Sequence, residues 1–85
     1  MQIFVKPPNS GATRVFDCSP QTTLEEFTRW YEDITGWPSR AYYILFSGRP
    51  LPHMGPDQDR TFGQLNIQRE DTFHLMPRFR ALMKN

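Results

Sequence analysis

Only one stretch of this 85-residue chain has the spacing of an amphipathic helix, and this limits how much of a sheet the chain could cover. Its apolar residues recur at intervals of three, four and three, which places them on one helical face; they are Leu24, Phe27, Tyr31 and Ile34. Thr22 or Thr23 can accept a backbone N–H as the N-cap, and Gly36 followed by Pro38 is typical of a helix end. We therefore expect a helix over about residues 23–35.

Other segments have the composition and alternation of strands. They are "QIFVK" near the start, "TRVFDC" after a loop of roughly four to six residues, "AYYILFSG" with "RPL" as a short continuation, and "TFHLM". The order β-β-α-β-β predicts an α+β fold in which a mixed sheet packs on one helix. The residues expected to face inward are Ile3, Val5, Phe16, Cys18, Leu24, Phe27, Tyr31, Ile44, Leu51, Ile67, Phe73 and Leu75.

A single helix covers one sheet face, so the strands should be polar on the other face. The segment "AYYILFSG" does not follow this rule, because apolar side chains alternate to both sides of it. Pairing it with the last strand would set Leu45 beside His74 and Met76, with Arg49 and Arg69 as candidate rim residues. An apolar patch with a polar rim indicates a protein-binding site. Periodicity alone leaves it equally open that these are ordinary exposed apolar residues.

Composition argues against several other functions. A net charge of +1 and a pI near 7.9 lack the basic excess that nucleic-acid binding requires, and there is no apolar run of about 18 residues for a membrane span. Cys18 is the one cysteine, so no intramolecular disulfide can form, and we expect a cytoplasmic or nuclear protein. His53, His74 and the loop acids do not have metal-ligand spacing. We predict no enzyme activity, no metal and no cofactor.

Several segments match those of one known family in the same order. "MQIFVK", "TLEEF", "GWP", "LFSGRPL" and "TFGQLNIQREDTFHL" lie between residues 1 and 80, and together they resemble ubiquitin. The resemblance implies the β-grasp fold, a mixed sheet wrapped around one helix. It also implies one ubiquitin-like domain over residues 1–80, followed by a flexible extension over residues 81–85.

The resemblance assigns binding surfaces as well. The positions that match the family's main recognition patch are Leu45, His74 and Met76, which keep its aliphatic and imidazole chemistry. A second family patch is matched by Trp37, Pro77 and Phe79, where aromatic surface is gained, and aromatic residues are frequent at binding hot spots.

The chain differs from the family in the features needed for conjugation. Where the family ends in Gly-Gly, this sequence has Ala81 and Leu82, whose side chains restrict a tail that must thread narrow enzyme channels. The family's main chain-linking lysines are matched by Arg49 and Arg69, which cannot act as acceptor amines. Pro77 lacks a backbone donor, so we expect ladder pairing to stop at Met76.

Taken together, these features predict a non-conjugatable ubiquitin-like domain that docks non-covalently through its apolar sheet patch. The expected partners are ubiquitin-binding domains, ligases, deubiquitinases or proteasome receptors, with neither nucleic acid nor membrane. We expect a monomer or a domain that continues into a longer protein. The alternative is a divergent or engineered covalent ubiquitin-like modifier.

Overall fold

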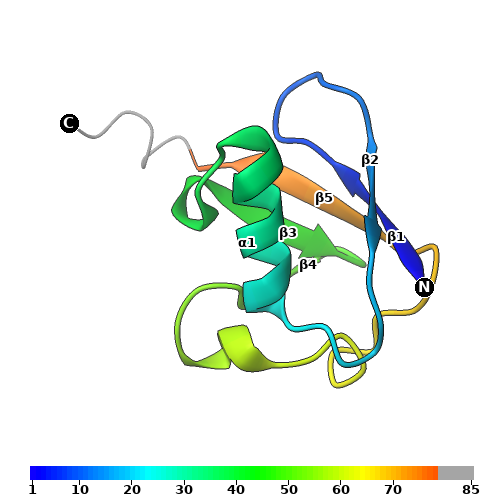
Figure 1. Cartoon of the computed structure of the whole chain (residues 1–85). Helices are drawn as coiled ribbons and strands as arrows, with labels where there is room; N and C mark the ends of the chain where they lie inside the picture. Colours follow the sequence, from blue (N-terminus) through cyan, green and yellow to red (C-terminus); the bar gives the residue numbers. More distant parts are fainter. Residues whose placement is uncertain (79–85) are drawn as a thin grey trace.

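The computed structural model describes residues 1–78, which form one helix packed across one face of a five-stranded sheet (Figure 1). The strands are β1 (Gln2–Lys6), β2 (Arg14–Asp17), β3 (Tyr42–Phe46), β4 (Arg49–Pro50) and β5 (Thr72–Pro77); the helix is α1 (Leu24–Thr35), and two 3-10 turns are η1 (Ser39–Ala41) and η2 (Pro56–Asp59). The α+β class is therefore confirmed. The segment "RPL", expected as a short continuation, forms a separate strand of two residues, β4.

The sheet has the order β2-β1-β5-β3-β4, and it is mixed because β1 and β5 run parallel while the other neighbours are antiparallel. The β1–β2 connection covers residues 7–13 and is longer than the four to six residues predicted. Within it the Asn9 side chain accepts the Gly11 N–H at 2.8 Å, an Asx-type turn that uses additional residues. Strand β2 ends at Asp17, so Cys18 lies just beyond it and is only half-buried.

Both ends of α1 are fixed by the caps that the sequence predicts. Thr23 accepts the Glu26 N–H at 3.1 Å, and the Glu26 carboxylate accepts the Thr23 N–H at 2.9 Å. This reciprocal capping box stabilises a helix start by about 1 kcal/mol. Gly36 closes the helix at φ 81°, a left-handed conformation that glycine adopts without strain, and its N–H donates to Glu32 O.

The apolar stripe of α1 is not buried along its whole length. Ile34 is 42% exposed, whereas Thr28 is buried. At about 100° per residue, the buried arc is centred on Leu24 and Tyr31, and Ile34 falls at its margin while Thr28 falls inside it. Ile34 shares the helical spacing of the apolar stripe but was not among the residues expected to face inward, and the structure agrees with that set on α1.

The prediction that pairing stops at Met76 was wrong. Strand β5 runs through Pro77, which lies opposite Tyr42, and the Arg78 N–H still donates to Ala41 O at 2.9 Å. In an antiparallel pair, hydrogen-bonded and non-hydrogen-bonded positions alternate. The Arg78 bond therefore places Pro77 at a non-hydrogen-bonded position, where the missing N–H removes no bond to β3.

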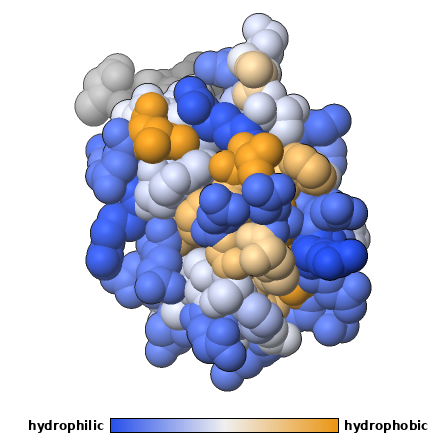
Figure 2. Space-filling model, turned by 45° about the vertical axis from the view of Figure 1, so that its right-hand side comes forward, coloured by the Kyte–Doolittle hydropathy of each residue, from blue (hydrophilic) through white to orange (hydrophobic). Residues whose placement is uncertain are grey.

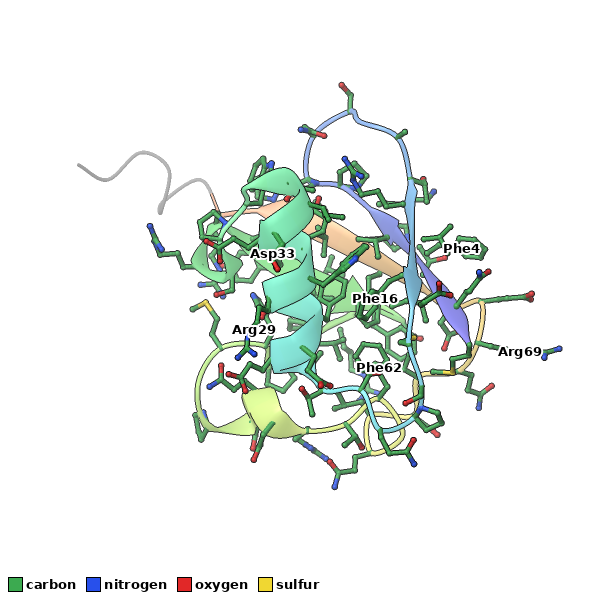
Figure 3. All side chains as sticks on the ribbon, viewed as in Figure 1. Phe4, Phe16, Arg29, Asp33, Phe62 and Arg69 are labelled. Atoms are coloured by element: carbon green, nitrogen blue, oxygen red, sulfur yellow. The ribbon has the colours of Figure 1, made fainter. Side chains whose placement is uncertain are left out.

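The core lies between α1 and the sheet and is rich in aromatic rings. Ten of the expected inward residues are buried; Leu51 and Cys18 are only partly so. Three apolar residues that were not predicted are also buried, namely Ala41, Tyr42 and Phe62. Figure 3 shows Phe16 and Phe62 beside the helix, and their ring centroids lie 6.2 Å apart. Trp30 is half-buried beside the core, with its ring centroid 4.5 Å from that of Phe16.

The loop between β4 and η2 is anchored by a buried histidine. His53 is 2% exposed, and its ring stacks on Tyr42 with centroids 5.2 Å apart and an interplanar angle of 3°. Nε2 lies 2.9 Å from Ser39 O, and because a carbonyl oxygen only accepts, Nε2 donates to it. His53 thus joins the loop to η1 and β3 as a structural residue.

Candidate protein-binding face

The sheet face opposite α1 carries a group of apolar and aromatic side chains from two neighbouring strands. Leu45 lies directly opposite His74, and Tyr43 lies directly opposite Met76, in the β3–β5 register. Side chains at opposed positions of antiparallel strands point to the same face, with Cβ atoms about 5 Å apart. The structure therefore brings Tyr43, Leu45, His74 and Met76 together, and we call these four residues the outer-face patch.

Exposure separates this patch sharply from the core. Tyr43 is 44% exposed and Met76 is 46% exposed; His74 is exposed and Leu45 is half-buried. Their chain neighbours Ile44 and Leu75, which point the other way, are 0% and 2% exposed. The predicted strand register is thus confirmed, because a slip of one residue would have exchanged the two sets.

Further apolar groups extend the same face toward β2. Phe4 lies opposite Val15 on one side and Thr72 on the other, and it alternates with the buried Ile3 and Val5. In Figure 3 Phe4 lies beyond β1, away from the side chains beside the helix. The uncovered face is therefore partly apolar across most of the sheet.

A polar hollow adjoins the outer-face patch on the β1 side. It measures about 390 Å³ and is lined by His74 and Met76 from β5, by Lys6, and by the β1–β2 loop, including Asn9 and Thr13. Lys6 pairs with His74 in the parallel β1–β5 register. The patch thus has a cationic, hydrogen-bonding hollow along one flank.

The opposite flank carries an arginine held in a defined position. The Arg78 guanidinium lies over the Tyr43 ring, with Cζ 4.1 Å from the ring centroid, and Nε donates to Tyr42 O at 3.2 Å. A guanidinium over an aromatic face is attracted by the ring quadrupole. The sequence analysis assigned neither Arg78 nor Tyr43 to the site; for Tyr43, its alternation with Ile44 was the available signal.

The two candidate rim residues lie at the margin of this face. Arg49 is opposite Phe46, whose ring packs on Phe73 in the core, so the Arg49 side chain leaves the edge strand on the helix side. Arg69 lies in the turn before β5 and points away from the body of the molecule (Figure 3). Neither residue lies within the outer-face patch.

Two of the three residues of the second predicted patch fall within the described part of the chain. Trp37 is half-buried and lines a groove of about 270 Å³ between the end of α1 and the β1–β2 loop, together with Pro7, Arg14 and Ile34. Pro77 lies opposite the buried Tyr42 on the helix side of the sheet. Phe79 falls outside the described residues.

The side of the molecule that carries β1 and β2 has exposed apolar residues that are not clustered like those of the outer-face patch. Figure 2 turns this side forward and shows apolar groups as separate spots between polar side chains. Val15 on β2 is 47% exposed, about as much as Met76, yet it lies outside the four clustered residues.

The side chains of residues 1–78 that could ligate a metal ion are not grouped together. Within residues 1–78 no group of three His, Cys, Asp or Glu side chains could hold a metal ion, and no helix has the length and apolarity to cross a bilayer. Burial raises the pKa of the Cys18 thiol, with a smaller contribution from Asp17, and this disfavours the nucleophilic thiolate. The chain matches no known family model.

Proposed function

We propose that this chain is a ubiquitin-like domain of the β-grasp type that docks non-covalently to proteins of the ubiquitin pathway through the outer-face patch. The fold part of the proposal is supported by the mixed five-stranded sheet with one helix on one face, together with the ordered sequence resemblance. The partners would be ubiquitin-binding domains, ligases, deubiquitinases or proteasome receptors. The chain would act as a recognition surface and not as an enzyme.

One observation carries the docking part of the proposal. Tyr43, Leu45, His74 and Met76 form a cluster on the sheet face that α1 leaves uncovered, although a sheet covered on one side is normally polar on the other. Aromatic residues and methionine are enriched in protein interfaces, and methionine adapts its shape to different partners. A polar hollow on one flank and an arginine on the other provide the hydrophilic rim that such interfaces have.

Substitution at matched positions tests the proposal. We expect Leu45→Ala and Met76→Ala to weaken binding of a responsive ubiquitin-binding domain by about 1 to 3 kcal/mol, because each removes apolar contact at the centre of the interface. Val15→Ala is the matched control, since Val15 has the exposure of Met76 but lies outside the outer-face patch. Isothermal titration calorimetry would measure the affinities, and denaturant unfolding would verify that all three variants stay folded. Equal losses for Val15→Ala and Met76→Ala would contradict the proposal.

A further inference from the structure

Three of the four methionines lie in the described part of the chain, and they differ in their surroundings. Met1 is half-buried and packs against the core, so its thioether is partly shielded from solvent. Met54 is 39% exposed in the loop between β4 and η2, and Met76 is 46% exposed in the outer-face patch. Because an oxidant must reach the sulfur atom, Met54 and Met76 are the methionines that should react.

Met76 differs from Met54 in what its side chain contributes to the molecule. The β3–β5 register sets Met76 directly opposite Tyr43, and His74 lies two residues before it on the same face. Opposed side chains of antiparallel strands have Cβ atoms about 5 Å apart, a separation at which a thioether packs favourably beside an aromatic ring. Met76 therefore supplies apolar, polarizable surface within the patch, whereas Met54 lies in a loop outside it.

The polar hollow beside the patch offers the Met76 side chain a second environment. Met76 belongs to the patch and also lines this hollow, whose walls include Lys6, Asn9 and Thr13. The ammonium, carboxamide and hydroxyl groups of these three residues are hydrogen-bond donors. A thioether sulfur is a weak acceptor, whereas the oxygen of a sulfoxide is a strong one. The patch therefore suits the reduced side chain, and the hollow suits the oxidised one.

We propose that Met76 is a redox-sensitive site at which a hydroperoxide switches off the outer-face patch by forming methionine sulfoxide. A lone pair of the thioether sulfur attacks one peroxide oxygen, and the O–O bond breaks as the S–O bond forms. The sulfur loses two electrons to the peroxide. With hydrogen peroxide, the proton of the transferred oxygen passes to the departing hydroxide, which leaves as water. The inference rests on the proposed function, because it specifies how the same surface is regulated.

The sulfoxide changes the patch in two ways. A polar S–O group replaces thioether surface opposite Tyr43, so an apolar side chain of a partner has to displace water from it. Hydrogen bonds from Lys6, Asn9 or Thr13 to the sulfoxide oxygen hold the side chain toward the hollow and away from the apolar centre of the patch. Because Met76 lies outside the core, its oxidation leaves the fold intact.

The first measurement needs no partner protein. The 85-residue chain is treated with hydrogen peroxide, catalase removes the excess, and peptide mass spectrometry follows each methionine. We expect Met76 to oxidise at least as fast as Met54 and about threefold or more faster than Met1. The backbone amides that line the hollow should then shift in NMR spectra of the unaltered chain but not in those of Met76→Leu, and circular dichroism should show an unchanged fold.

The second measurement compares affinities before and after the same treatment. Isothermal titration calorimetry uses the ubiquitin-binding domain that serves for the substitutions above. Oxidation should weaken its binding to the unaltered chain and to Met54→Leu by about tenfold, and should change binding to Met76→Leu by less than about twofold. Met54→Leu is the matched control, since it removes an exposed methionine outside the patch. Treatment with methionine sulfoxide reductases should restore the affinity, because they reverse this modification.

The outcomes separate this inference from the proposed function. If the chain carries Met76 sulfoxide but binds as tightly as before treatment, or if Met76→Leu loses as much affinity as the unaltered chain, the switch is overturned and the docking face stands. Slower oxidation of Met76 than of Met1, or unchanged amide shifts around the hollow, would overturn it as well. If the untreated chain binds no ubiquitin-binding domain through the patch, both proposals fail.

Discussion

Replacing Tyr42 by phenylalanine should stabilise this protein, although most substitutions in a core destabilise it. The Tyr42 side chain is fully buried, and within residues 1–78 its hydroxyl has no hydrogen-bond partner. The ring itself is well packed, with His53 stacked on it and Tyr31 meeting it edge-on at 5.6 Å. The change to phenylalanine removes only the hydroxyl and keeps these ring contacts.

The expected gain follows from two opposing contributions. A buried hydroxyl without a partner costs about 1 to 3 kcal/mol, because its hydrogen bonds to water are lost on folding and not replaced. Removing one oxygen atom leaves a small void, which costs about 24 cal/mol per Å³ and so a few tenths of a kcal/mol. We therefore expect Tyr42→Phe to raise the free energy of unfolding by about 0.5 to 2 kcal/mol.

Equilibrium unfolding in urea, followed by circular dichroism at pH 7, measures this difference directly. Tyr43→Phe is the matched control, because Tyr43 is the neighbouring tyrosine and is 44% exposed. Its loss of a solvated hydroxyl should change stability by less than about 0.5 kcal/mol. If Tyr42→Phe destabilised the protein by 1 kcal/mol or more, the hydroxyl would have a partner in solution and the reasoning would be refuted.

Three further predictions follow from the same structure. Burial raises the pKa of Tyr42, with smaller contributions from Tyr31 and Glu32. The neutral form is therefore favoured on folding, so the free energy of unfolding should be constant below the unfolded tyrosine pKa of about 10 and should fall above it. In urea titrations between pH 9 and 11, this fall should be shallower for Tyr42→Phe than for the unaltered protein. An equal fall in both would show that ionisation of Tyr42 is not its cause. His53→Ala should lower the free energy of unfolding by about 2 to 4 kcal/mol, because ring packing and the bond to Ser39 O are lost. His74→Ala removes an exposed side chain and should change it by less than about 0.5 kcal/mol. Similar losses for the two variants would argue against His53 as a buried anchor of the loop. The 85-residue chain should form no thioester with a ubiquitin-activating enzyme, ATP and a conjugating enzyme, whereas replacing Ala81 and Leu82 by glycine and ending the chain there should restore some charging; a thioester on the unaltered chain would favour the covalent-modifier alternative.

The elements and the strand register could be predicted because local signals fix them. The capping residues and apolar spacing placed α1 within one residue of its observed start. Alternation along β3 and β5 assigned each side chain to a face, so the cluster of Leu45, His74 and Met76 was expected before the fold was known. Because side chains alternate along a strand, each strand can place only one of two sets of residues against the helix, and the buried Ile44 and Leu75 show which set it is.

Two buried residues that the sequence did not place in the core owe their burial to distant parts of the chain. Phe62 belongs to a turn region without strand or helix period, and it is buried because its N–H donates to Thr22 O at 2.7 Å and its ring meets core rings from β2 and β5. His53 lies in a polar loop and is buried by its stacking on Tyr42. No periodic pattern in the sequence reports such contacts.

The candidate site, too, could be predicted from the sequence only in part. Its apolar centre could be predicted from alternation, but the position of Arg78 over Tyr43 depends on bonds to Ala41 and Tyr42 that form only when β5 continues past Pro77. Because we expected ladder pairing to stop at Met76, the sequence did not predict this arrangement. Trp37, assigned to a binding patch by resemblance, lines the groove beside α1.

Backbone amide chemical-shift mapping during titration with a panel of ubiquitin-binding domains tests the docking proposal most directly. The proposal predicts that at least one domain produces its largest shifts at Leu45, His74 and Met76, while the amides of α1 change little because the helix lies on the opposite side of the sheet. Shifts that are absent at these three residues for every domain, or that are confined to α1, would contradict the central claim.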